Sequence, residues 1–466
     1  MVPQKQPPRP VLRKKQDVDM TQGSILRHII AFSVPLMIGN LFQQMYNMVD
    51  TWVIGNFVEN PNAFSAVGSV TPIVNMLIGT FLGFSSGAGV VISQYYGAKR
   101  FHDVSNAVHT AILMTVIIGL VLTVAGVALI PFMLNLMKMP EEVIGEATTY
   151  LTIYFSGLMS LVLYNIGSGI LRAVGDSTRP FIFLAICAVV NTVLDLVFVI
   201  VFEMGVAGVA IATIIAQGFS AILIMITLMC TKSCIKLQLK KLRIHWSILK
   251  KIIRVGIPSA LQMSITSFSN VFGQSYINYF GPDCMSGWGT YLKVDHLILL
   301  PMQSVSLACT TFVGQNLGKN LVQRAKKGIR VSLLLALIIT GLLIIPVVVF
   351  APAVAAFFNP SENVVYYGSM LLRWMTPFYM FCVVNQILSC ALRGAGNSKA
   401  PMITMLMSYV VFRQIYLFCM SHICNEIIPI AMGYPSGWFL CGLTTTIYYL
   451  KVPLNKTRLV EDIPVK

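Results

Sequence analysis

The residue types that could do chemistry in this chain are oxygen-bearing side chains inside long apolar segments. In the first half, Asn191 and Asp195 are four residues apart, which places both on one face of a helix, and Asp50 and Thr213 add a second carboxyl and a hydroxyl. Burial disfavours a charged carboxylate, so either Asp could hold a proton at neutral pH. The same four side chains could instead coordinate Na+, because hard cations prefer oxygen ligands. A structural hydrogen-bond network is the third interpretation.

A row of polar residues leads up to Asp50. Asn40, Gln43 and Asn47 recur at spacings of three and four, so with Asp50 they form one stripe along a helix. This stripe must face protein or water rather than lipid. A second polar row, at four-residue spacing, consists of Gln262, Thr266 and Asn270. We interpret both rows as candidate walls of a substrate cavity.

The second half carries a different set of charges inside its apolar segments. Lys293 and Asp295 are two residues apart and so do not share a helix face, which favours partners on other helices. One interpretation is a structural ion pair, for instance between Asp295 and Arg413, because buried charges normally find partners. The other is that Lys293 and Asp295 line the cavity and contact substrate or relay protons. His296 and Arg373 complete the set.

The composition places these residues in a membrane. Of the 466 residues, 56% are hydrophobic and 11% are charged, whereas soluble proteins carry about 25% charged residues. Long unbroken apolar runs also exclude an outer-membrane barrel, whose strands show short alternating segments. We therefore predict an all-α polytopic membrane protein with twelve transmembrane helices. The predicted spans are 25–55, 65–95, 105–134, 144–167, 180–202, 206–230, 251–280, 288–315, 328–352, 364–390, 400–422 and 428–450.

The basic residues indicate how the spans face. When the loops are placed on alternate sides, 29 of the 33 Lys and Arg residues fall on one side and only Lys138 falls on the other. By the positive-inside rule both termini are cytoplasmic. The net charge of +16 is therefore a topology signal and does not indicate a nucleic-acid partner. Within the membrane region the charges balance, three acids against three bases.

The chain contains an internal repeat. LRAVGDSTRP at 171–180 matches LRGAGNSKAP at 392–401 at an offset of 221. Matches at the same offset are Gln94 with Gln315 and Gly97 with Gly318. The duplication predicts two six-helix bundles related by a pseudo-two-fold axis along the membrane normal. Such repeats are one plan for secondary transporters, in which one half rocks against the other around a central site.

The predicted division of the chain follows this repeat. We expect a disordered cytoplasmic tail (1–20), an N-terminal six-helix lobe (21–230), a cytoplasmic linker (231–250), a C-terminal six-helix lobe (251–450) and a second cytoplasmic tail (451–466). The first tail is polar and rich in Pro, Gln and Lys, without the apolar core of a signal peptide. Met20 could be the true start.

These features together resemble one transporter family. The segment PLMIGNLFQQMYNMVDTWVIG (35–55), the element SQYYGAKR (93–100) and the paired repeat loops resemble the multidrug and toxic compound extrusion (MATE) family, over about residues 21–450. The resemblance, closest to the bacterial DinF-like branch, implies a multi-pass antiporter of the bacterial inner membrane. Such a protein exports amphipathic, often cationic, compounds in exchange for H+ or Na+.

The resemblance also assigns roles to residues. In the family, an acid in span one, an Asn and an Asp in span five and a Thr in span six form the coupling site, and these map onto Asp50, Asn191, Asp195 and Thr213. A second-half acid of one family branch is replaced by Thr266, so coupling is expected in the first half. Possible Na+ at the same four positions would be the only metal.

Other classes of protein fit less well. There is no Walker A motif, no CxxC pair for zinc and no cluster typical of an enzyme, so we predict neither an enzyme nor a cofactor other than the coupling ion. The expected partners are small organic cations or drugs and the lipid bilayer, with no nucleic acid, and the chain is expected to act as a monomer. The alternative function is a lipid-linked oligosaccharide flippase of related architecture, which would need a strongly cationic cavity.

Overall fold

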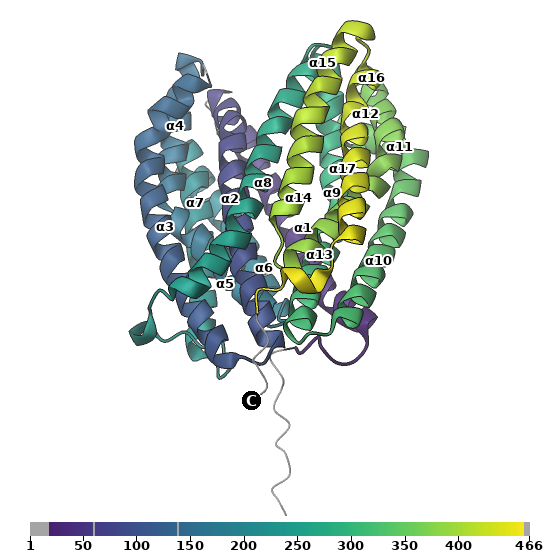
Figure 1. Cartoon of the computed structure of the whole chain (residues 1–466). Coiled ribbons are helices and arrows are strands. Elements are labelled where there is room, and N and C mark those ends of the chain that lie inside the picture. Colours follow the sequence, from purple (N-terminus) through teal and green to yellow (C-terminus); the bar gives the residue numbers. More distant parts are fainter. Residues whose placement is uncertain (1–17, 59–60, 138, 461–466) are drawn as a thin grey trace, which may run out of the picture.

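The computed structural model describes residues 18–58, 61–137 and 139–460, and the regular structure within these ranges is all helical (Figure 1). The elements of the first half are α1 (Ile25–Phe57), α2 (Pro61–Gly97), α3 (Phe101–Leu136), α4 (Glu141–Ser156), α5 (Leu158–Ala173), α6 (Thr178–Leu196), the π-helical turn η1 (Val197–Val201) and α7 (Gly205–Cys230). The short η2 (Leu239–Lys241) lies in the connection between the halves.

The second half follows a similar order with more breaks. Its elements are α8 (Trp246–Asn278), α9 (Pro282–Gly318), α10 (Val322–Val349), α11 (Ala351–Phe358), α12 (Glu362–Met375), η3 (Thr376–Phe378), α13 (Tyr379–Gly394), α14 (Lys399–Met405), the π-helical η4 (Leu406–Phe412), α15 (Arg413–Ile423), α16 (Ile427–Ala431), α17 (Gly433–Lys451) and η5 (Leu454–Thr457).

Apolar spans account for nearly all of the predicted membrane helices. Within the described residues, ten helices are long and apolar enough to cross a bilayer, and α4 with α5, bent by 47° at Gly157, makes an eleventh. The remaining predicted span corresponds to α8, which is not in that set. This helix has 33 residues, well beyond the ~20 needed to cross, but its serines, Gln262 and Asn270 lower its hydropathy. In Figure 1, α8 runs alongside the other long helices.

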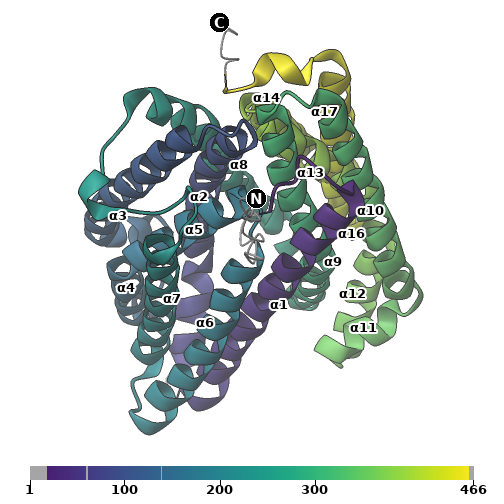
Figure 2. The same ribbon diagram turned by 90° about the horizontal axis from the view of Figure 1, so that it is seen from below.

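The helices form two lobes. Seen from below in Figure 2, α2–α7 gather on one side and α9–α17 on the other, and α1 and α8 lie between them. Each of these two helices is the first of its half. α1 packs on α6 and on α9, whereas α8 packs on α2 and on α14. The first helix of each half therefore contacts both lobes.

Small residues allow one of these contacts to be close. A Cβ atom added to Gly87 on α2 would lie 2.6 Å from the Cα atom of Gly256 on α8, closer than any real contact of this kind. Small residues let the backbones of membrane helices approach in this way. The sequence around these glycines thus fixes how α8 sits against the first lobe.

Both described ends of the chain lie at the same end of the molecule, which we call the terminus-bearing end. The backbone nitrogen of Val18 donates to Val174 at 3.0 Å, and Met20 is only 1% exposed. Of the predicted disordered tail, residues 1–17 are outside the described residues, but residues 18–20 pack against the helices. The second predicted tail begins as the end of α17 and η5, and its residues 461–466 are likewise outside the described residues.

Candidate functional site

Asp50 on α1 and Asp195 on α6 meet inside the first lobe, where their carboxyl groups form a side-chain hydrogen bond. Asp195 is fully buried, and Asn191, one turn earlier on α6, is 1% exposed. The amide nitrogen of Asn191 donates to the hydroxyl of Thr213 on α7 at 3.4 Å, and that hydroxyl donates to the Val209 carbonyl at 3.0 Å. The structure therefore brings all four predicted coupling residues into one cluster.

Several oxygens of this cluster have no further partner. Among the described residues, both carboxyl oxygens of Asp195, one of Asp50 and the amide oxygen of Asn191 are buried without another hydrogen bond. A hydrogen bond between two carboxyl groups requires a proton on one of them, because two ionised carboxylates at this range repel each other. Buried oxygens without donors are otherwise costly. The cluster can therefore hold a proton, or a hard cation such as Na+.

A cavity of about 400 Å³ lies between the lobes, within the size range of small-molecule sites. Residues of α1, α2, α5, α6, α7, α8, α9 and α13 line it, so both halves of the chain build it. Of the predicted cavity residues, Asn40 and Gln43 are part of the wall. Amides make up much of the remaining polar lining: Gln44, Asn165, Gln217, Gln303 and Gln386.

The other predicted polar wall lies elsewhere. The amide of Gln262 is buried and donates to the sulfur of Met405, and the hydroxyl of Thr266 donates to the Gln262 carbonyl at 2.7 Å. Asn270 is exposed, as is Asn47 on α1. These four residues do not line the central cavity, because this part of α8 turns its polar row toward α14 rather than toward the space between the lobes.

The charges of the second lobe also find partners that the sequence did not indicate. The expected ion pair between Asp295 and Arg413 is wrong. Asp295 accepts a hydrogen bond from the Tyr291 hydroxyl at 3.5 Å, whereas Arg413 donates to the Ser269 hydroxyl at 2.7 Å and lies 4.6 Å from the ring centre of Tyr434. Aromatic hydroxyls and rings stabilise these groups in place of opposite charges.

Lys293 and its neighbours lie outside the cavity wall as well. The ammonium group of Lys293 lies 5.5 Å from the ring centre of Phe358, and the residue is exposed. Asp295 does not line the central cavity either, and His296 and Arg373 are exposed. The ion pairs found in the described part of the chain join Arg100 with Asp103 at 2.5 Å and Arg179 with Asp176.

Two arginines that the sequence analysis did not single out line the cavity. Arg172 stands in the last turn of α5 and Arg393 in the last turn of α13, at matching positions of the internal repeat. Arg393 is 5% exposed, and its Nε atom is buried without a partner. Their identity in both repeat copies was the signal that could have found them.

The terminus-bearing side of the cavity is closed by two repeat-related glutamines, Gln94 on α2 and Gln315 on α9, both fully buried. Each side-chain nitrogen donates across the lobes at 2.9 Å, from Gln94 to the Gly394 carbonyl and from Gln315 to the Ala173 carbonyl. Their side-chain oxygens accept from two terminal segments: from the backbone nitrogen of Leu459 at 2.8 Å for Gln94, and of Met20 at 2.9 Å for Gln315. Glycines permit the close approach, because a Cβ at Gly97 or Gly318 would overlap the carbonyl oxygen of the opposite glutamine.

Two helical lobes around a central cavity, with a buried carboxyl pair in one lobe, define a multi-pass membrane transporter of the secondary type. The family model named MatE matches residues 35–197 and 258–418, once in each half of the chain. The chain belongs to the MatE family, and it is accordingly a transporter and not an enzyme.

Known proteins agree with this assignment. The chain is 30% identical to the probable multidrug resistance protein YpnP of Bacillus subtilis, over 85% of this chain and 88% of that protein. It is 29% identical to the probable multidrug resistance protein YoeA of the same organism, over 95% and 97%. An outward-facing structure of a multidrug resistance MATE family transporter of the MOP superfamily superposes with a TM-score of 0.87, at 22% identity over 93% of this chain and 97% of that one.

Proposed function

We propose that this chain is a secondary active efflux antiporter that exports amphipathic organic compounds in exchange for an ion, by alternating access of its two lobes. The observation that carries the proposal is the buried carboxyl pair of Asp50 and Asp195. Both helices that supply this pair also line the cavity, α1 through Gln43 and α6 through Cys187. The charge state of the pair is therefore placed to affect the substrate site.

The coupling follows from electrostatics. With a proton between the carboxyls, α1 and α6 can stay in contact, whereas loss of that proton leaves two negative charges facing each other. Repulsion then favours a different position of α1. Because α1 also packs on α9 of the other lobe, a change at the pair can alter the contact between lobes. The direct hydrogen bond between the carboxyls supports H+ rather than Na+ as the coupling ion.

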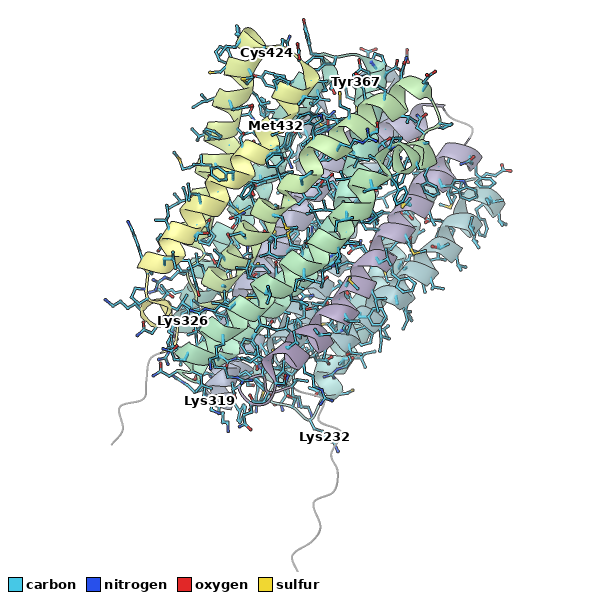
Figure 3. The ribbon with its side chains drawn as sticks, turned by 90° about the vertical axis from the view of Figure 1, so that its right-hand side faces the viewer. Lys232, Lys319, Lys326, Tyr367, Cys424 and Met432 are labelled. Atoms are coloured by element: carbon cyan, nitrogen blue, oxygen red, sulfur yellow. The ribbon has the colours of Figure 1, made fainter. Side chains whose placement is uncertain are left out.

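We further propose that the terminus-bearing end faces the cytoplasm of a bacterium, with the protein in the plasma membrane. Figure 3 shows Lys232, Lys319 and Lys326 at this end, and Tyr367, Cys424 and Met432 at the opposite end. An excess of Lys and Arg marks the cytoplasmic side of membrane proteins. A single chain supplies the whole cavity wall, which supports a monomer as the working unit.

Reconstituted protein tests the coupling. Proteoliposomes are given a pH gradient or a Na+ gradient separately, and export is followed for an organic cation and an organic anion. Asp50→Asn and Asp195→Asn should each abolish gradient-driven export of whichever compound the wild type transports. Asp283→Asn is the control, because Asp283 is exposed and bonded to Asn363. Export that is unchanged in Asp50→Asn would refute the proposed role of the pair.

A further inference from the structure

We propose that the central cavity binds the anionic group of an amphipathic substrate, a phosphate or a carboxylate, through Arg172 and Arg393. The inference rests on the proposed export function and names the substrate class of its cavity. It differs from the organic cations expected from the family resemblance. The uncompensated positive charge of the cavity wall is the observation behind it.

The two arginines have no acidic partner. Both line the cavity, and within the residues that the structure describes, neither takes part in an ion pair. Arg393 is 95% buried, since only 5% of it is exposed, and its Nε atom has no hydrogen-bond partner. A buried charge without a partner is costly. A bound anion would supply the missing compensation.

The rest of the wall suits an anion with an apolar body. No other charged residue lines the cavity among the described residues, so the wall carries two positive charges and no negative one. Planar guanidinium groups match the geometry of carboxylate and phosphate oxygens, and amides such as Gln386 can donate to the same oxygens. Leu82, Leu161, Met263 and Leu300 supply apolar surface. The geometry fits a ring system that carries one acidic group.

The position of the arginines links anion binding to the closure between the lobes. Ala173 and Gly394, the residues that directly follow Arg172 and Arg393, accept the cross-lobe hydrogen bonds of the paired glutamines. The two guanidinium groups therefore belong to opposite lobes at the point where the lobes meet. An anion held by both would contact both halves of the transporter.

Equilibrium binding to the purified full chain in lipid nanodiscs tests the proposal. Two fluorescent probe pairs differ only in the acidic group: flavin mononucleotide against riboflavin for phosphate, and dansylglycine against dansylamide for carboxylate. We expect at least one acidic probe to bind about tenfold more tightly than its neutral partner. Arg393→Gln and Arg172→Gln should each remove that preference, and Arg393→Lys should retain part of it. Arg373→Gln, at an exposed position, should leave it unchanged.

The outcomes separate the alternatives. A preference confined to flavin mononucleotide identifies a phosphate site, and one confined to dansylglycine identifies a carboxylate site. Equal binding of acidic and neutral probes by the wild type would overturn the proposal, even if the variants fail to fold. So would a preference that survives in both Gln variants. Binding at equilibrium needs no ion gradient, so loss of export in Asp50→Asn and loss of anion binding in Arg393→Gln fail or succeed independently.

Discussion

Replacing Gln315 by Leu tests whether the paired glutamines hold the terminus-bearing side closed. In the structure the side chain is fully buried, donates to Ala173 and accepts from Met20, both at 2.9 Å. Leu is of similar size but makes neither bond. Each lost hydrogen bond removes about 1 kcal/mol, and groups left buried and unpaired cost about 1–3 kcal/mol each. The closed arrangement should therefore lose about 2–4 kcal/mol.

A loss of this size matters because a transporter must open this side during its cycle. The closed and open arrangements then differ by only a few kcal/mol. At 1.4 kcal/mol for each factor of ten, the variant should shift the ratio of closed to open molecules by about 30- to 700-fold. The groups that Gln315 bonds can regain water when the side opens, so the penalty falls on the closed state.

A native cysteine reports the shift. Cys390 lines the cavity and is 4% exposed. Membrane vesicles with the terminus-bearing side outward are treated with a membrane-impermeant maleimide, and labelled peptides are quantified by mass spectrometry. Labelling of Cys390 should rise at least about tenfold in Gln315→Leu. Gln94→Leu should behave alike, since Gln94 makes the equivalent bonds.

The control is Gln274→Leu, which removes a glutamine whose only printed bond, at 2.9 Å to Asn278, stays within the exposed face of α8. Its labelling should equal that of the wild type. If Cys390 reacts at the wild-type rate in both Gln315→Leu and Gln94→Leu, and both proteins are folded, the glutamines do not control the closure.

Further predictions concern the same closure. Gly97→Ala should impair export and raise Cys390 labelling, because its Cβ would overlap the Gln315 carbonyl oxygen, whereas Gly289→Ala, with open space around it, should be neutral in the same assays. Partial burial opposes ionisation of Asp19, but the hydrogen bonds from Thr21 hold its pKa below the ordinary value of 3.8. A lowered folded-state pKa stabilises the docked segment above pH 3.8, and this stabilisation is lost as pH falls through the lowered value. Asp19→Asn should therefore speed amide exchange at Met20 at neutral pH, and an unchanged exchange rate would contradict this.

The sequence predicted the local part of the first-lobe site well. Helical spacing alone places Asn191 and Asp195 on one face, and the cost of a charge in a span marks Asp50 as a candidate. That α1 meets α6 is a tertiary contact, which no local pattern contains. The family resemblance supplied it, and the structure places the two carboxyls together. The assignment of a coupling role to them stays a prediction.

The sequence failed where helices extend beyond their apolar runs. The predicted spans ended at 167 and 390, so Arg172 and Arg393 counted as loop charges. The helices α5 and α13 end at Ala173 and Gly394, which places both arginines in the last turn with their side chains on the cavity. Hydropathy ends a span at the first charge, whereas a helix continues as long as its backbone bonds and packing are favourable.

Pairing in the second lobe failed for a different reason. Charge alone suggested Asp295 with Arg413, but tyrosine hydroxyls and rings satisfy both groups. A sequence shows which groups need partners but not which helix faces meet. Tyrosines on several helices were as able to stabilise these charges as an opposite charge was.

The two halves share the residues that close the transporter but not those that respond to an ion. The closing glutamines and the cavity arginines occur in both copies at an offset of 221, whereas that offset places Tyr416 opposite Asp195, and the offset of 223 that applies near α1 places Gly273 opposite Asp50. Closure needs matching contributions from both lobes, since each glutamine bonds the other lobe's backbone. Coupling needs only one lobe to change, because α1 contacts both. A second copy of the carboxyl pair would add another ion to every cycle without adding any contact to the closure.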